Sequence, residues 1–192
     1  ARTPGLATTS RAIPATAQGL RPRVAQCGPP LEVLAQGEWP KLRLMERFRA
    51  GAGPQGGCIL VASASFWEGF DVPGDALQLV VIDKLPFPPP GDPLVEARTL
   101  QIEQSGGSAF KEYALAEAAV ALKQGAGRLI RHESDRGVLV VCDSRLVRMG
   151  YGKRLIAALP PMRRLSGAEE FHAALEDLAS VTRTSTTDQT FL

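Results

Sequence analysis

Two arginines, Arg128 and Arg131, lie three positions apart in the segment KQGAGRLIR (residues 123–131). On a helix, side chains with this spacing project to one side. Guanidinium groups keep their charge and bind phosphate oxygens with a matching fork geometry. The pair therefore predicts a phosphate clamp that stabilises charge on a transferred phosphoryl group. A basic helix end that complements the helix dipole is the alternative, and this segment alone leaves both interpretations open.

A second polar segment, SASFWEGFDVPG (residues 63–74), directly follows the apolar run CILVA (residues 58–62). In open parallel sheets, ligands bind beyond the carboxyl ends of the strands. Asp71 is suited to accept hydrogen bonds from a ribose, and Glu68 is suited to orient an arginine. A loop with ordinary helix-capping residues is the alternative interpretation.

The same segment begins with residues that suit nucleic acid. Ser63 and Ser65 can donate hydrogen bonds to backbone phosphates. Phe66 and Trp67 offer aromatic surfaces, which stack on single-stranded bases but more often fill protein cores. Both interpretations of the aromatic pair stay open.

Buried strands and helices must position these segments. Three runs rich in Val, Ile and Leu are typical of parallel strands that are buried on both faces: Cys58–Ala62, Leu77–Ile82 and Gly137–Cys142. The stretch from Tyr113 to Lys123 is the strongest helical pattern between the second and third runs. This alternation predicts an α/β fold around a mainly parallel sheet.

Weaker patterns predict the remaining elements. We expect short strands over 5–9 and 31–35, a helix over 12–20 broken by Pro14 and Gly19, and amphipathic helices over 40–49 and 168–179. The proline-rich residues 85–93 exclude regular structure. The predicted organisation is a poorly defined N-terminal edge (1–30), a main domain (31–163), a terminal helix (164–180) and a disordered tail (181–192).

Composition narrows the class of protein. The 192 residues are 44% hydrophobic and 22% charged, which is typical of a globular domain. The net charge of +2 is too small to indicate a nucleic-acid partner by itself. Three cysteines without a C-x-x-C spacing argue against a zinc, iron–sulfur or disulfide framework, and Cys58 and Cys142 are predicted to be buried. Without a long apolar run we expect no membrane partner and a cytoplasmic location.

The two polar segments together resemble a known family. SFWEGFDVPG resembles motif V and QGAGRLIR resembles motif VI of superfamily 2 helicases. The wider pattern, including VIDKLPF and DRGVLVVCDSR, is similar to the DinG/XPD branch, especially its YoaA-like members. The resemblance runs from about Leu31 to Arg163.

This resemblance implies the second of two RecA-like domains, a three-layer sandwich of the P-loop NTPase class. Arg128 and Arg131 would be arginine fingers that reach the γ-phosphate of ATP, and Gln124 would couple the nucleotide to the domain interface. The nucleotide side of the cleft would include Glu68, Gly69, Asp71 and Gly127. A strand of single-stranded DNA would pass Ser63 and Ser65, with Ser10 and Arg11 as remnants of motif IV.

The resemblance also implies what another part of the protein must supply. The sequence contains no G-x-x-x-x-G-K-[ST] loop, no D-E-x-H box and no four-cysteine cluster. ATP with Mg²⁺ would be held mainly by the first RecA-like domain, which is also the only expected place for an iron–sulfur cluster. We therefore expect the C-terminal motor domain of an ATP-dependent 5′–3′ DNA helicase, inactive as an isolated chain.

Two other functions compete with this expectation. One is a non-catalytic module that binds single-stranded DNA or a protein. The other is a nuclease-linked relative, which only an additional domain could support. On the helicase hypothesis, the arginines and the loop with Glu68 and Asp71 are expected to meet at the ligand-binding rim of the sheet.

Overall fold

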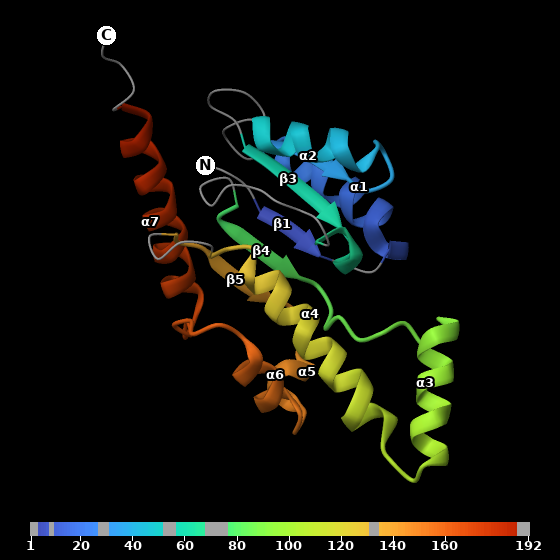
Figure 1. Cartoon of the computed structure of the whole chain (residues 1–192). Helices are drawn as coiled ribbons and strands as arrows, with labels where there is room; N and C mark the ends of the chain where they lie inside the picture. The colour runs from blue at the N-terminus through green and yellow to red at the C-terminus, as the bar shows by residue number, and fades with distance from the viewer. Residues whose placement is uncertain are drawn as a thin grey trace.

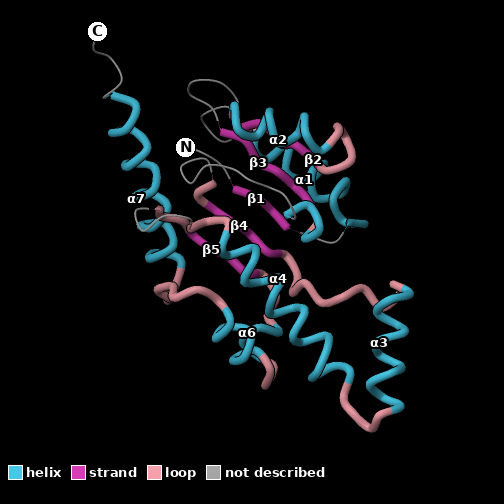
Figure 2. The backbone as a smooth tube through the Cα atoms, viewed as in Figure 1, coloured by secondary structure: helices cyan, strands magenta, loops and turns pink. Residues whose placement is uncertain are grey.

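A single parallel sheet organises the part of the chain that the computed structural model describes: residues 4–7, 10–26, 31–51, 57–67, 77–130 and 135–187. Its strand order is β2-β3-β1-β4-β5, and every neighbouring pair is parallel (Figures 1 and 2). The strands are β1 (Pro4–Ala7), β2 (Leu31–Ala35), β3 (Gly57–Ala62), β4 (Leu79–Ile82) and β5 (Val138–Val141).

The register brings the ends of the strands together. Ala7 of β1 is the Cα partner of both Ala62 in β3 and Ile82 in β4, and Ile82 is the partner of Val141 in β5. All five strands therefore finish along one border of the sheet, which we call the carboxyl edge. The border where they begin is the amino edge.

Helices cover both faces of the sheet, because alternate strand residues point to opposite sides. On one face, α2 (Lys41–Ala50) and α4 (Leu115–Gly127) join a core cluster that includes Leu60 and Val80. On the other face, α1 (Ile13–Val24) packs in a second cluster. All six residues of β3 are buried, as expected for a strand covered on both faces. The predicted three-layer α/β sandwich is confirmed.

A helical hairpin leads into α4. α3 (Pro93–Gln104) begins at Asp92, whose Oδ1 accepts hydrogen bonds from the amides of Leu94 and Val95. A π-helical turn (Phe110–Ala114) then continues into α4. α3 lies away from the sheet (Figure 1). The proline-rich segment before it has no regular structure, which confirms that prediction.

Four short helices and the long helix α7 complete the described chain. η1 (Ser10–Ala12) and η2 (Ala64–Trp67) lie just beyond β1 and β3, and α5 (Arg145–Arg148), α6 (Gly152–Ala158) and α7 (Ala168–Thr187) follow β5. Beside the sheet, α7 buries Leu178, whose carbonyl accepts a 3.4 Å hydrogen bond from Gln78 Nε2.

The predicted domain boundaries were wrong at both ends. β1 lies in the middle of the sheet, so residues before 31 are part of the main domain rather than a loose edge. Pro14 does not break α1, because it occupies the first turn, where its missing N–H has no helical partner to lose. The terminal helix α7 runs to Thr187, past its predicted end at 180.

The two described cysteines differ in their surroundings. Cys58 in β3 is fully buried, and burial raises the pKa of its thiol to about 12. Cys142 follows β5 and is exposed, so the prediction that it is buried was wrong. The apolar run continues past Val141, where β5 ends. The sequence pattern therefore does not show at which residue the burial stops.

Candidate functional site

Polar side chains meet where β2 and β3 end. Ser63 directly follows β3, and its amide and hydroxyl both donate to Oε1 of Gln36, at 2.8 and 2.9 Å. Gln36 directly follows β2, and its backbone N–H donates to the carbonyl oxygen of Val61 in β3. Ser63 Oγ also lies 2.9 Å from Ser65 Oγ. These three residues, Gln36, Ser63 and Ser65, form a cluster at the carboxyl edge.

The direction of the protons assigns different roles to the two serines. A hydroxyl carries one proton, and that of Ser63 is donated to Gln36. Ser65 must therefore donate to Ser63. Ser63 is only 8% exposed, whereas Ser65 is exposed in η2. Ser65 is consequently the serine that can turn toward a ligand, and Ser63 holds it in place.

The sequence interpretation missed Gln36. The available signal was a polar residue directly after a predicted strand, the same pattern that pointed to Ser63. This signal is weak, because a turn follows Gln36 and polar residues are common in turns. Only the pairing of β2 with β3 reveals that Gln36 faces the serines. Neighbouring strands lie about 4.8 Å apart, which is within reach of one amide side chain.

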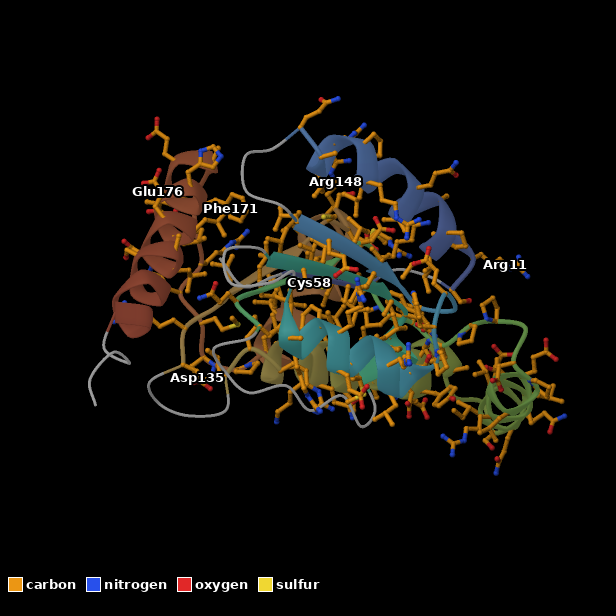
Figure 3. The ribbon with its side chains drawn as sticks, turned by 90° about the horizontal axis from the view of Figure 1, so that it is seen from above. Arg11, Cys58, Asp135, Arg148, Phe171 and Glu176 are labelled. Carbon is orange, nitrogen blue, oxygen red and sulfur yellow. The ribbon has the colours of Figure 1, made fainter. Side chains whose placement is uncertain are left out.

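Ser10 and Arg11 lie at the same edge. Both are exposed residues of η1, just beyond β1, and β1 is the neighbour of β3 in the sheet. Figure 3 shows the Arg11 side chain extending outward, away from the ribbon. The carboxyl edge thus combines hydroxyl groups with a cation, which is suited to contacts with backbone phosphates.

The described residues of the segment KQGAGRLIR lie at the other edge of the sheet. Gln124 and Gly127 are exposed in the last turn of α4, and Arg128 is the C-cap residue. Arg128 is half-buried, and its Nε atom is buried. A Cβ at Gly127 would meet no atom within 4 Å, so packing within the described chain does not require glycine there.

Leu129 anchors this end of α4 against the amino edge. It is fully buried, and a Cβ added to Gly137 would lie 2.8 Å from Leu129 Cδ2 and 3.2 Å from the carbonyl oxygen of Gln78. Gln78 precedes β4, and its carbonyl oxygen accepts a 2.8 Å hydrogen bond from the amide of Val138, the first residue of β5. The close approach of these backbones therefore places Arg128 beside the beginnings of β4 and β5.

The expected meeting of the arginines with the loop of Glu68 and Asp71 at one rim stays a prediction, because that loop and Arg131 lie outside the described residues. Of the described motif residues, Ser63 and Ser65 lie at the carboxyl edge. Arg128 lies at the amino edge, because α4 runs antiparallel to the strands. In Figure 3, Arg11 and Asp135, which precedes β5, mark these opposite ends of the molecule. The remaining predicted residues, Arg131, Glu68, Gly69 and Asp71, lie outside the described residues. Residues 68–76 connect Trp67 beyond β3 to Leu77 before β4.

A carboxylate fastens the proline-rich segment to the end of β5. Asp143 Oδ2 accepts a hydrogen bond from the amide of Leu85 at 2.9 Å and pairs with Arg145 Nη2 at 2.6 Å. The hydrogen-bonded guanidinium of Arg145, together with the Leu85 amide, holds the pKa of the Asp143 carboxyl well below its ordinary value. Arg145 also lies over the ring of Phe87 at 5.5 Å. Two ends of strands are thereby tied together at the carboxyl edge.

The described residues show neither a metal-binding cluster nor a membrane-spanning helix. Among the described residues, no group of three or more His, Cys, Asp or Glu side chains could hold a metal ion. In the same part of the chain, no helix has the length and apolar character needed to cross a membrane.

Comparisons with known proteins agree with the motifs. A 134-residue stretch is 52% identical to the ATP-dependent DNA helicase YoaA of Escherichia coli K12, covering 70% of this chain and 20% of that protein. A longer stretch of 178 residues is 42% identical to the ATP-dependent helicase DinG of Mycobacterium tuberculosis H37Ra, covering 93% and 26%. The chain therefore spans about a fifth to a quarter of the length of these relatives.

A solved XPD helicase structure overlaps 85% of this chain and 36% of its own, with a TM-score of 0.45 and 15% identity. The family model described as the helicase C-terminal domain matches residues 13–162, which include α1, the carboxyl-edge serines, α4 and β5. On this match and on the motifs that it contains, the chain belongs to the helicase C-terminal domain family.

Proposed function

We propose that this chain is the C-terminal motor domain of an ATP-dependent 5′–3′ DNA helicase that acts in DNA repair or replication. One observation carries the proposal. One sheet presents side chains that are suited to phosphate at both of its edges: Ser65 and Arg11 at the carboxyl edge, and Arg128 at the amino edge. Ser65 and Arg128 lie within the match to the helicase C-terminal domain. A motor needs a nucleotide surface and a DNA surface that move together, and a buried sheet between them transmits movement.

The amino edge would act on the nucleotide. Arg128 would stabilise negative charge that develops on the transferred phosphoryl group, with Arg131 as the second finger. Gln124 lies one helical turn before Arg128, so both project from the same side of α4. The open space at Gly127 leaves room for the opposing domain to approach closely. Glu68, Gly69 and Asp71 would line the same cleft.

ATP with Mg²⁺ would be held mainly by the first RecA-like domain of the same helicase, which is the partner that this chain requires. The described residues would contribute cationic and amide groups at the amino edge, from Arg128 and Gln124. An iron–sulfur cluster would belong to the first domain as well. The cytoplasm, where chromosomal DNA lies in bacteria, is the proposed location.

The carboxyl edge would hold single-stranded DNA. Ser65 would exchange its hydrogen bond to Ser63 for one to a phosphate, while Ser63 stays bonded to Gln36, and Ser10 and Arg11 would contact the neighbouring backbone. Such contacts position a strand without reading its sequence, which suits an enzyme that translocates along any DNA. Closure of the two domains on ATP would move this edge as one body with the sheet.

The arginine fingers give the decisive experiment. In the full-length protein, Arg131→Ala is expected to abolish DNA unwinding while ATP binding largely survives, because a finger acts on the transition state rather than on the bound nucleotide. Unwinding is measured with a fluorescent duplex, and ATP binding is measured with a fluorescent ATP analogue. Arg148→Ala, which removes an exposed arginine of α5, is the control.

Equal loss of ATP binding and unwinding would assign Arg131 a structural role and would contradict the proposal. A salt-dependent affinity for single-stranded DNA, without any effect of ATP in the full-length protein, would instead identify a non-catalytic binding module.

A further inference from the structure

A small pocket opens beside the serine cluster at the carboxyl edge. Its volume is about 140 Å³, and it lies between the turn after β2 and η2. The lining residues are Gln36, Trp39, Lys41, Leu44, Ser65 and Phe66. Ser65 therefore belongs both to the proposed DNA surface and to the wall of this pocket.

The pocket combines aromatic surface with positive charge. The indole of Trp39 is 45% exposed, although burial of so large an apolar side chain would stabilise the fold. The guanidinium of Arg43 lies 5.8 Å from the centroid of that ring, and Lys41 Nζ lies 5.1 Å from the centroid of Phe66. Phe66 itself is buried, which confirms the core interpretation for this aromatic.

The turn that carries Trp39 is held by several independent contacts. Gly37 has a φ of +98°, a conformation that favours glycine. Glu38 accepts a hydrogen bond from the amide of Ala35 at 3.3 Å and pairs with Arg21 at 2.5 Å. Gln36 and Trp39 form a β-bridge. The indole is therefore presented from an ordered turn, which lowers the entropy lost when a ligand binds.

The charges around the pocket select an anionic, aromatic ligand. Lys41 and Arg43 supply two cations, and the carboxylate of Glu38 is already paired with Arg21. A nucleotide unit of single-stranded DNA has a flat base that stacks on an aromatic ring and a phosphate that pairs with a cation.

We infer that this pocket is a subsite for one nucleotide of the bound DNA strand, with its base stacked on Trp39 and its phosphate contacted by Lys41. The inference rests on the proposed function, because it extends the DNA surface from Ser65 toward the outer strand β2. On this inference, the turn 36–39 contributes to the affinity for DNA and does not take part in nucleotide hydrolysis.

The test uses the full-length protein and measures DNA-stimulated ATP turnover. Trp39→Ala is expected to raise the DNA concentration for half-maximal stimulation about tenfold, through loss of stacking, with little change in the turnover at saturating DNA. Trp39→Phe, which retains an aromatic ring, is expected to restore most of the affinity. Leu42→Ala removes a neighbouring side chain that is 66% exposed and does not line the pocket, and it serves as the matched control.

A direct measurement on the unsubstituted protein protects the test against misfolding of the variants. Oligodeoxynucleotides that contain 5-iododeoxyuridine cross-link on irradiation to aromatic side chains that touch the base. Trypsin releases residues 24–41 as one peptide, in which Trp39 is the single aromatic residue. Mass spectrometry is expected to find the cross-link on this peptide.

The outcomes separate the two proposals. DNA-stimulated turnover with no cross-link on residues 24–41, and with an unchanged half-maximal DNA concentration in Trp39→Ala, would overturn the subsite and leave the motor assignment intact. Absence of DNA-stimulated turnover in the unsubstituted protein would overturn both.

Discussion

The two edges of the sheet are built in different ways. At the carboxyl edge, side chains hold one another: Gln36 accepts two hydrogen bonds from Ser63, and Asp143 pairs with Arg145. At the amino edge, close packing fixes the end of α4, since Gly137 lets the carbonyl of Gln78 and the side chain of Leu129 approach closely.

This contrast suits the proposed tasks of the two edges. A DNA surface must accept a moving strand, and exposed hydroxyl groups can exchange one partner for another. An arginine finger must reach one position, so a residue anchored next to a fully buried leucine has an advantage. If the contrast is correct, substitutions at the two edges will separate DNA affinity from catalytic turnover.

The largest expected effect is the loss of a finger. In the full-length protein, Arg128→Ala is expected to lower saturated ATP turnover by about 10³-fold or more, while affinity for single-stranded DNA stays close to that of the unsubstituted protein. Ser65→Ala is expected to do the reverse and weaken DNA binding about fivefold with turnover retained. Steady-state kinetics and fluorescence anisotropy measure the two quantities. If either variant lowers both quantities equally, the two edges are not functionally separate.

Two glycines near Arg128 give a sharper comparison within the amino edge. Gly137→Ala is expected to lower the free energy of unfolding by about 1–3 kcal/mol, because the new Cβ would overlap Leu129 and crowd a backbone carbonyl. Gly127→Ala is expected to leave it unchanged or raise it by up to about 1 kcal/mol, because the added Cβ meets open space within a helix. Urea unfolding checks both values.

The Gly127→Ala variant is also expected to reduce ATP turnover, since the opposing domain would meet the added methyl group. Full turnover in that variant would remove the proposed reason for glycine at this position.

A smaller effect is expected from the polar cluster. Gln36→Ala leaves the amide and hydroxyl of Ser63 without their acceptor, and we expect it to lower the free energy of unfolding by about 1 kcal/mol. It should also weaken DNA binding, because Ser65 loses its support. Gln101→Ala on the exposed face of α3 is the control, with an expected change within about 0.5 kcal/mol. An unchanged stability of Gln36→Ala would show that water replaces the lost acceptor.

The smallest expected effect is a change in the free energy of unfolding with pH, caused by Asp143 at the carboxyl edge. The pKa of Asp143 is lowered in the folded state from its ordinary value of 3.8, so the unfolded chain binds the proton more readily. Its contribution to stability is therefore complete above about pH 5 and is lost as the pH falls below about 4. Asp143→Asn is expected to flatten that part of the stability profile in urea unfolding at several pH values. Parallel profiles for the two proteins would exclude this contribution.

Most of the strands and the α4 helix were predictable from patterns. The runs of Val, Ile and Leu in β3, β4 and β5 marked these strands, but burial on both faces holds along the whole of β3 only. β4 is buried at alternate residues, and β5, at the edge of the sheet, buries only Val138. β1 was placed as a short strand, but its central position was not foreseen. Its four residues, PGLA, carry little apolar surface, and they are held by partners from β3 and β4 on both sides.

The residues of two short motifs were enough to identify the family by resemblance, and residue types alone predicted phosphate-binding chemistry for Arg128 and a polar segment after β3. Those properties belong to short stretches of chain. The position of Ser65 and Arg128 at opposite edges, the support of Ser65 by Gln36 and the pocket beside Trp39 depend on which strands are neighbours. That order arises from contacts between residues far apart in the chain, and no local pattern encodes it.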